Sequence, residues 1–132
     1  MIWIDFEYNE KMVLMCACLK DGVGDIFDLR DNRETELLRK YIEDNIDNIF
    51  VSYALGAEIE SLLRLGISVD KMNCIDLMAE SRMITMSHDA YFTADSTMLG
   101  QLRALLRKDV KEDKIHKEAM RELILSKTSW ND

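Results

Sequence analysis

Two carboxylates near the N-terminus are spaced for metal chemistry. Asp5 and Glu7 lie two residues apart in the stretch IWIDFEY, whose alternating apolar residues predict a β-strand over 2–8. Side chains at positions i and i+2 of a strand point to the same face, with Cα atoms about 6–7 Å apart. Carboxylates this close repel each other, and Mg²⁺ or Mn²⁺ relieves the repulsion because both ions prefer oxygen ligands. The pair therefore predicts a metal site, and two such ions about 3.5–4 Å apart activate water for phosphodiester cleavage.

An ordinary surface position on an edge strand is the alternative for this acidic pair. The stretch MVLMCACL over 12–19 is almost continuously apolar, which is typical of a strand covered on both faces. We therefore expect a sheet with two covered faces. Charged residues in such a sheet need a partner, and this favours the metal site over the surface position.

A third acid, Glu58, lies on a helix predicted over 54–65. Glu60 precedes Arg64 by four residues, the favourable order for a surface ion pair, so Glu60 is expected on the outside. Glu58 shares its side of the helix with small and apolar residues, namely Ala54, Ser61 and Leu65. A metal site beside the first strand would explain an acid there. The alternative is a partly exposed glutamate at the edge of the helix.

The chain alternates strands and helices before it becomes helical. Asp76 stands directly before Leu-Met-Ala-Glu and is most simply a helix N-cap. The expected strands cover 2–8, 12–19 and 25–29, as an antiparallel meander, and 49–53, parallel to its neighbour. One helix is expected to begin at Asp31 and another at Asp95 or Ser96. Three more are expected over 54–65, 76–83 and 111–125, with a loop over 86–94. This order predicts an α/β fold: a ribonuclease-H-like mixed sheet, with an antiparallel β-meander plus a parallel strand, flanked by helices.

The composition indicates a single acidic domain over 1–132. The chain is 48% hydrophobic and carries a net charge of −8, which argues against a basic nucleic-acid surface across its whole length. Residues 101–132 nevertheless contribute +2, so phosphate contacts are expected from that part. No run of about 18 apolar residues predicts a membrane span. Three cysteines without metal-ligand spacing suit a reducing cytosol, so we expect a cytoplasmic protein without a secretory signal.

Four residues are candidates for nucleic-acid contacts. Arg103 and Arg107 lie near one face of a predicted helix and are placed to meet a DNA backbone, although a solvated helix face also explains them. Tyr91 and Phe92 lie in the predicted loop, where aromatic side chains stack on bases in single-strand binding. Capping the core is the alternative for this aromatic pair.

Five segments, taken in order and spacing, resemble one family that covers nearly the whole chain. They are WIDFEYNE, VSYALGAEIESLLRLGI, CIDLMAESRMI, TMLGQLRALL and KIHKEAMRELILSKTSW. Together they resemble the DEDD-type 3′–5′ exonuclease domain of phage-type family A DNA polymerases. The resemblance implies a proofreading exonuclease that removes nucleotides from a single-stranded DNA 3′ end with two Mg²⁺ or Mn²⁺ ions, in the host cytoplasm if the chain is phage-encoded.

The resemblance also assigns roles to individual residues. Asp5 and Glu7 match the first motif and would be metal ligands, and Glu7 would also orient the attacking water. Glu58 falls where the second motif usually has Asp, and Ala54 where it usually has Asn. The extra methylene of Glu58 moves its carboxylate relative to the family's pattern.

The family's fourth acid belongs to a third motif, on a helix beyond the segment matched here, so the fold is expected to be incomplete at the C-terminus. Weak or no activity is expected from the chain alone. It would be a fragment of a polymerase, a split subunit completed by another chain, or a stand-alone module used for interaction. The missing helix predicts exposed apolar surface, hence a partner or self-association. The alternative function is a non-catalytic ribonuclease-H-like module that binds DNA or a replication protein.

Overall fold

The computed structural model describes residues 1–85 and 114–126, with side chains described for 1–83 and 118–126. The predicted loop over 86–94 and the helix expected from Asp95 or Ser96 lie outside these residues. Among the helices of the described part, none has the length and apolar character needed to cross a membrane.

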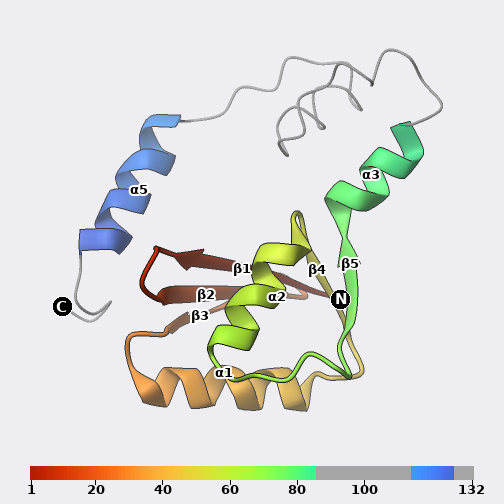
Figure 1. The fold of residues 1–132 in the computed structure, drawn as a ribbon, viewed down its shortest axis with the longest axis horizontal. Coiled ribbons are helices and arrows are strands. Elements are labelled where there is room, and N and C mark those ends of the chain that lie inside the picture. The colour runs from red at the N-terminus through yellow and green to blue at the C-terminus, as the bar shows by residue number, and fades with distance from the viewer. Residues whose placement is uncertain (86–113, 127–132) are drawn as a thin grey trace.

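A mixed five-stranded sheet organises the described part of the chain (Figure 1), with strand order β3-β2-β1-β4-β5. The strands are β1 (Ile2–Tyr8), β2 (Val13–Lys20), β3 (Val23–Asp28), β4 (Ile49–Ser52) and β5 (Asn73–Asp76). β2 pairs antiparallel with both β1 and β3, whereas β4 is parallel to β1 and β5 is parallel to β4. The predicted antiparallel meander and the parallel fourth strand are therefore confirmed.

The tight turn between β2 and β3 follows from two residues with positive φ. Asp21 has φ 52° and Gly22 has φ 81°, the left-handed pair that a two-residue hairpin turn requires. This turn sets the register in which Lys20 pairs with Val23. The third strand consequently begins two residues earlier than the expected Asp25.

The fifth strand, β5, is absent from the sequence-based expectation, which contained only four strands. Its segment Asn-Cys-Ile-Asp has only two apolar residues, too few to show a strand period. Pairing with β4 defines it instead, with Phe50 opposite Cys74 and Val51 opposite Ile75. Asp76 ends the strand and caps the next helix, since its Oδ1 accepts from the backbone N–H of Met78 at 2.9 Å, as the N-cap prediction required.

Four helices accompany the sheet within the described residues. They are α1 (Asn32–Asp44), α2 (Leu55–Arg64), α3 (Leu77–Thr85) and α5 (Lys114–Ser126). α1 begins where predicted, because Asp31 accepts from the Arg33 N–H at 2.8 Å. α2 ends at Arg64, with Leu65 at its C-cap, and the φ of 68° at the following Gly66 allows the Ile67 N–H to reach the Leu62 carbonyl at 2.9 Å.

One face of the sheet carries the main hydrophobic core. Ile2, Ile4 and Phe6 of β1 are all at most 5% exposed and pack with residues of α1 and α2. Figure 1 shows these two helices against the sheet. Tyr8, expected on the same face, is 44% exposed, because the pairing with β2 becomes irregular between Glu7 and Tyr8.

The expectation of a sheet covered on both faces is wrong for part of the described structure. Trp3, Leu19 and Ile26 lie on the face opposite the core and are 47%, 45% and 55% exposed. The apolar run in β2 is buried from Val13 to Cys16 but alternates beyond that point. The alternative for Asp5 and Glu7 is wrong about the edge strand, because β1 is the central strand of the sheet, and right about the surface position of Asp5, which is exposed.

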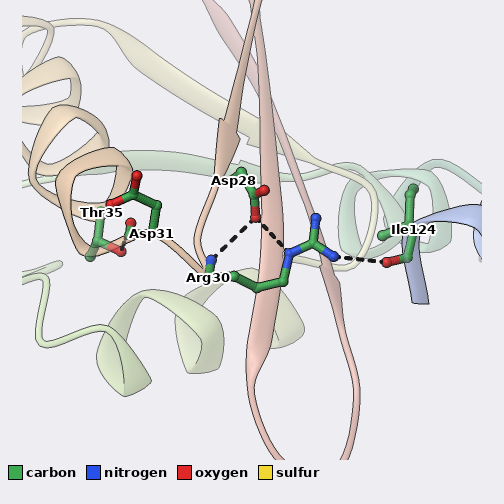
Figure 2. A network of polar contacts seen from close by, with 5 residues as sticks. All are labelled: Asp28, Arg30, Asp31, Thr35 and Ile124. Atoms are coloured by element: carbon green, nitrogen blue, oxygen red, sulfur yellow. Dashed lines mark hydrogen bonds and ion pairs between the residues drawn. The ribbon is translucent and has the colours of Figure 1, made fainter. Parts of the chain in front are cut away.

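α5 docks on the sheet through one apolar contact and one charged group. Ile124 is buried in a cluster with Leu14 and Met15 of β2. Figure 2 shows Arg30 between the two elements: its Nε bonds Asp28 Oδ1 at 2.7 Å, and its Nη1 donates to the Ile124 carbonyl at 3.1 Å. Both charged side chains are 8% exposed, so this ion pair is buried at the junction.

Candidate functional site

A hollow of about 830 Å³ opens on the partly uncovered face of the sheet. It lies where β4 ends and α2 begins. Its wall contains the three acids singled out from the sequence, which are Asp5, Glu7 and Glu58. The structure therefore brings together carboxylates that are more than fifty positions apart in the chain.

The register of the sheet explains why Asp5 and Glu7 meet α2. Trp3 pairs with Val51 of β4, and β4 ends at the next residue, Ser52, whereas β1 continues to Tyr8. The last half of β1 therefore extends beyond β4. Asp5 and Glu7 project from this extension on the face opposite the core. Asp5 is exposed and Glu7 is half-buried.

Glu58 is the buried member of the site, at 6% exposure. It lies in the first turn of α2 and accepts a hydrogen bond from Ser52 Oγ on Oε1 at 3.1 Å. Its second oxygen, Oε2, is buried and has no hydrogen-bond partner within the described residues. The alternative of a partly exposed glutamate at the helix edge is therefore wrong. Glu60 faces outward and pairs with Arg64 at 2.6 Å, as expected.

The environment raises the pKa of the Glu58 carboxyl from its ordinary value of 4.5 to about 7. Burial is the main cause, because it disfavours the charged form. The negative charges of Asp5 and Glu7 raise the pKa further, while the Ser52 hydroxyl and the Phe6 backbone N–H lower it by favouring the carboxylate. Near neutral pH, Glu58 is therefore populated in both its protonated and its ionised form.

The three acids of the hollow are of the donor type that a hard divalent cation takes. Carboxylate oxygens are what Mg²⁺ and Mn²⁺ prefer, and Mg²⁺ commonly takes only one or two protein carboxylates together with water and phosphate. Within residues 1–83 and 118–126, no three His, Cys, Asp or Glu side chains are arranged as a ready-made metal group. The fit rests instead on Glu58. Its buried Oε2 has no hydrogen-bond partner in the part of the chain that the structure describes, and the negative charges of Asp5 and Glu7 disfavour its ionised form.

The hollow also has an apolar part that the sequence reasoning did not assign to a site. Trp3, Ala17, Leu19 and Ile26 line it together with the acids. The signal was present, because the alternation of β1 already placed Trp3 on the same face as Asp5. The fold was needed to bring β2 and β3 beside it.

The four proposed nucleic-acid contacts stay predictions. Tyr91, Phe92, Arg103 and Arg107 all lie outside the residues that the structure describes.

The described residues define an α/β protein built on an open, mixed five-stranded sheet flanked by helices. Comparisons of the chain with protein-family models, with curated proteins and with solved structures find no match.

Proposed function

We propose that this chain is a ribonuclease-H-like nuclease module whose Asp5, Glu7 and Glu58 bind Mg²⁺ or Mn²⁺ and act at the 3′ end of single-stranded DNA. The observation that carries the proposal is the buried Glu58 carboxylate. Ser52 donates a hydrogen bond to one of its oxygens, and the other has no hydrogen-bond partner among the described residues, with two more acids nearby. A buried carboxyl of this kind is costly for a fold unless it is neutralised by a proton or a cation.

The arrangement of strands supports the ribonuclease-H-like part of the proposal. Three antiparallel strands are followed by two parallel ones, and the first strand of the chain is central. The candidate acids lie beside the carboxyl end of β4, where α/β sheets commonly bind ligands. The exonuclease part rests on the resemblance of the motif segments, to which Asp5, Glu7 and Glu58 all belong.

The bound cation would supply charge neutralisation for the phosphate and a lower pKa for a water molecule. Asp5 and Glu58 would hold it, and Glu7, half-buried at the mouth of the hollow, would hold it and accept the proton of the attacking water. Attack of the water oxygen on phosphorus would break the P–O3′ bond of the terminal linkage, release a nucleoside 5′-monophosphate and leave the shortened strand with a 3′ oxygen that takes a proton from solvent. Ser52 positions Glu58 through its hydrogen bond and touches none of the reacting atoms.

Digestion of 5′-labelled single-stranded DNA with Mn²⁺ tests this proposal. We expect slow shortening from the 3′ end by the wild-type chain and none by Asp5→Ala or Glu58→Gln. Glu60→Gln is the matched control, because Glu60 is on the same helix but pairs with Arg64 outside the hollow. Shortening that persists in Asp5→Ala, or its absence in the wild type, would count against a catalytic role for this chain.

A non-catalytic binding module is the second candidate function, and the partly uncovered sheet face favours it. Trp3, Leu19 and Ile26 are each about half exposed there. Such surface is typical of interaction sites, so the rest of a polymerase, a completing subunit or a second copy of the chain remain proposed partners. A wild-type chain that binds single-stranded DNA equally well with and without Mn²⁺, and does not cut it, would favour this candidate.

A further inference from the structure

The first part of β3 is an open edge of the sheet. Within the described residues, β3 pairs with β2 alone and stands at one end of the strand order (Figure 1). Its first four residues, Val23–Ile26, are all exposed, and the strand is buried only at Phe27 and Asp28. An edge strand presents a row of backbone N–H and C=O groups with which another extended chain can pair.

β3 lacks most of the features by which proteins block such an edge. Lysine, proline, a β-bulge and a very short strand each hinder the pairing of a further chain. The six residues of β3 contain no lysine and no proline, and their pairing with β2 runs without a shift from Val23 to Asp28. The opposite edge strand, β5, has only four residues and leads directly into α3. β3 is therefore the edge better suited to accept a further strand.

Gly24 indicates that β3 leaves room for another backbone. A Cβ at this position would meet the Cys18 carbonyl oxygen at 4.0 Å, an ordinary contact distance, and the φ of Gly24 is not positive. Neither the backbone nor the packing of the described residues therefore requires glycine here. Glycine inside a strand often marks the close approach of a ligand or of another backbone.

The side chains of this edge are apolar on one face and acidic beside it. Ile26 is 55% exposed and continues the half-exposed apolar surface of Leu19 and Trp3, on the face opposite the core. Asp25 is exposed and, within the part of the chain whose side chains are described, makes no ion pair. Asp21, exposed in the adjoining turn, adds a second negative charge.

We propose that the edge of β3 binds an extended peptide of alternating apolar and basic residues, which adds a sixth strand to the sheet. The peptide backbone pairs with β3, and specificity comes from alternate side chains. The apolar side chains extend the surface of Ile26 and Leu19, and the Lys or Arg side chains lie near Asp25. Cross-strand pairs of opposite charge stabilise a sheet, whereas like charges destabilise it.

A second copy of the chain is the competing occupant of this edge. Pairing of two β3 strands would bring two copies of Asp25 to one short edge, and each copy carries a net charge of −8. This repulsion favours the basic peptide over a second copy.

The test is a titration of the full chain, in EDTA, with two fluorescent peptides blocked at both ends, Lys-Val-Lys-Val-Lys-Val and Glu-Val-Glu-Val-Glu-Val. We expect the lysine peptide to bind more tightly. Asp25→Lys should weaken the lysine peptide roughly fivefold and strengthen the glutamate peptide. Asp70→Lys is the matched control, because it makes the same change of charge at an exposed residue shortly before β5, the opposite edge. EDTA removes any divalent metal, so a failure here leaves the proposed function untouched.

Two further peptides, N-methylated at every valine or at every lysine, test the backbone pairing with the wild-type chain. N-methylation removes the N–H that a strand donates, so at least one of them should lose binding. The proposal is overturned if both bind as well as the parent peptide, if Asp25→Lys and Asp70→Lys behave alike, or if the lysine peptide does not bind. Dimerisation of the chain alone, with slowed amide exchange over 23–26 and no peptide binding, would identify a second copy as the occupant and would also overturn it.

Discussion

The hydroxyl of Ser52 donates a hydrogen bond to Glu58 Oε1 across 3.1 Å, at the point where β4 ends and α2 begins. Both residues are buried, at 4% and 6% exposure. The bond fixes one carboxylate oxygen and leaves Oε2 without a partner in the described part of the chain. A side chain held this way is oriented before any ligand arrives, which reduces the entropy lost on binding.

Replacing Ser52 with Ala removes the contact that most favours the charged form of Glu58. We expect the pKa of the Glu58 carboxyl to rise further and Mn²⁺ to bind more weakly at pH 7. At pH 8.5, where Glu58 ionises in both proteins, the difference in Mn²⁺ affinity should shrink. Titration of both proteins at the two pH values measures this. A deficit of the same size at both values would contradict the expected role of Ser52.

The raised pKa of Glu58 predicts a pH dependence of the free energy of unfolding. The unfolded carboxyl loses its proton near pH 4.5 and the folded one near pH 7, so the folded state holds more protons between these values. The stabilising contribution of this proton is therefore present at pH 4.5 and is lost as the pH rises through 7. At about 1.36 kcal/mol for each pKa unit, this contribution is about 3 kcal/mol.

Urea unfolding in EDTA at pH 5 and pH 7.5 measures how much of the free energy of unfolding is lost as Glu58 ionises. Glu58→Gln, which cannot ionise, should lose less stability than the wild type over the same interval. Parallel behaviour of the two proteins would show that Glu58 titrates normally in the fold. Glu60→Gln, on the exposed side of α2, should behave as the wild type does.

The buried ion pair between Arg30 and Asp28 predicts how α5 is held on the sheet. Arg30→Ala removes the charge that compensates Asp28 and the donor to the Ile124 carbonyl, so it should lower the free energy of unfolding by roughly 3 kcal/mol. Arg64→Ala breaks an exposed pair and should cost less than about 1 kcal/mol. Urea unfolding measures both values, and limited proteolysis should cut α5 faster in Arg30→Ala. Equal costs for the two variants would contradict the inferred importance of the buried pair.

Local patterns in the sequence were sufficient for much of the fold. Alternation defined β1, and Asp31 and Asp76 marked helix starts through their side-chain oxygens. β5 could not be found this way, because its four residues owe their strand conformation to pairing with β4.

Those features of the site that depend on a single strand or a single helix were predictable from the sequence. The side of α2 shared with Ser61 and Leu65 made an inward Glu58 one of two alternatives, and the strand period placed Asp5 beside Glu7. The covering of the sheet was not predictable, because continuous apolar sequence in β2 does not specify which segments pack on each face. Trp3, which lies on the same side of β1 as Asp5, is 47% exposed at the hollow.

Titration of Mn²⁺ into the full chain at pH 7.5, with the free ion followed by electron paramagnetic resonance, tests the central claim most directly. The account predicts saturable binding that is reduced at least tenfold in Asp5→Asn and in Glu58→Gln and is unchanged in Glu60→Gln. Binding that is absent in the wild type, or equally strong in all four proteins, would contradict a metal site formed by Asp5, Glu7 and Glu58.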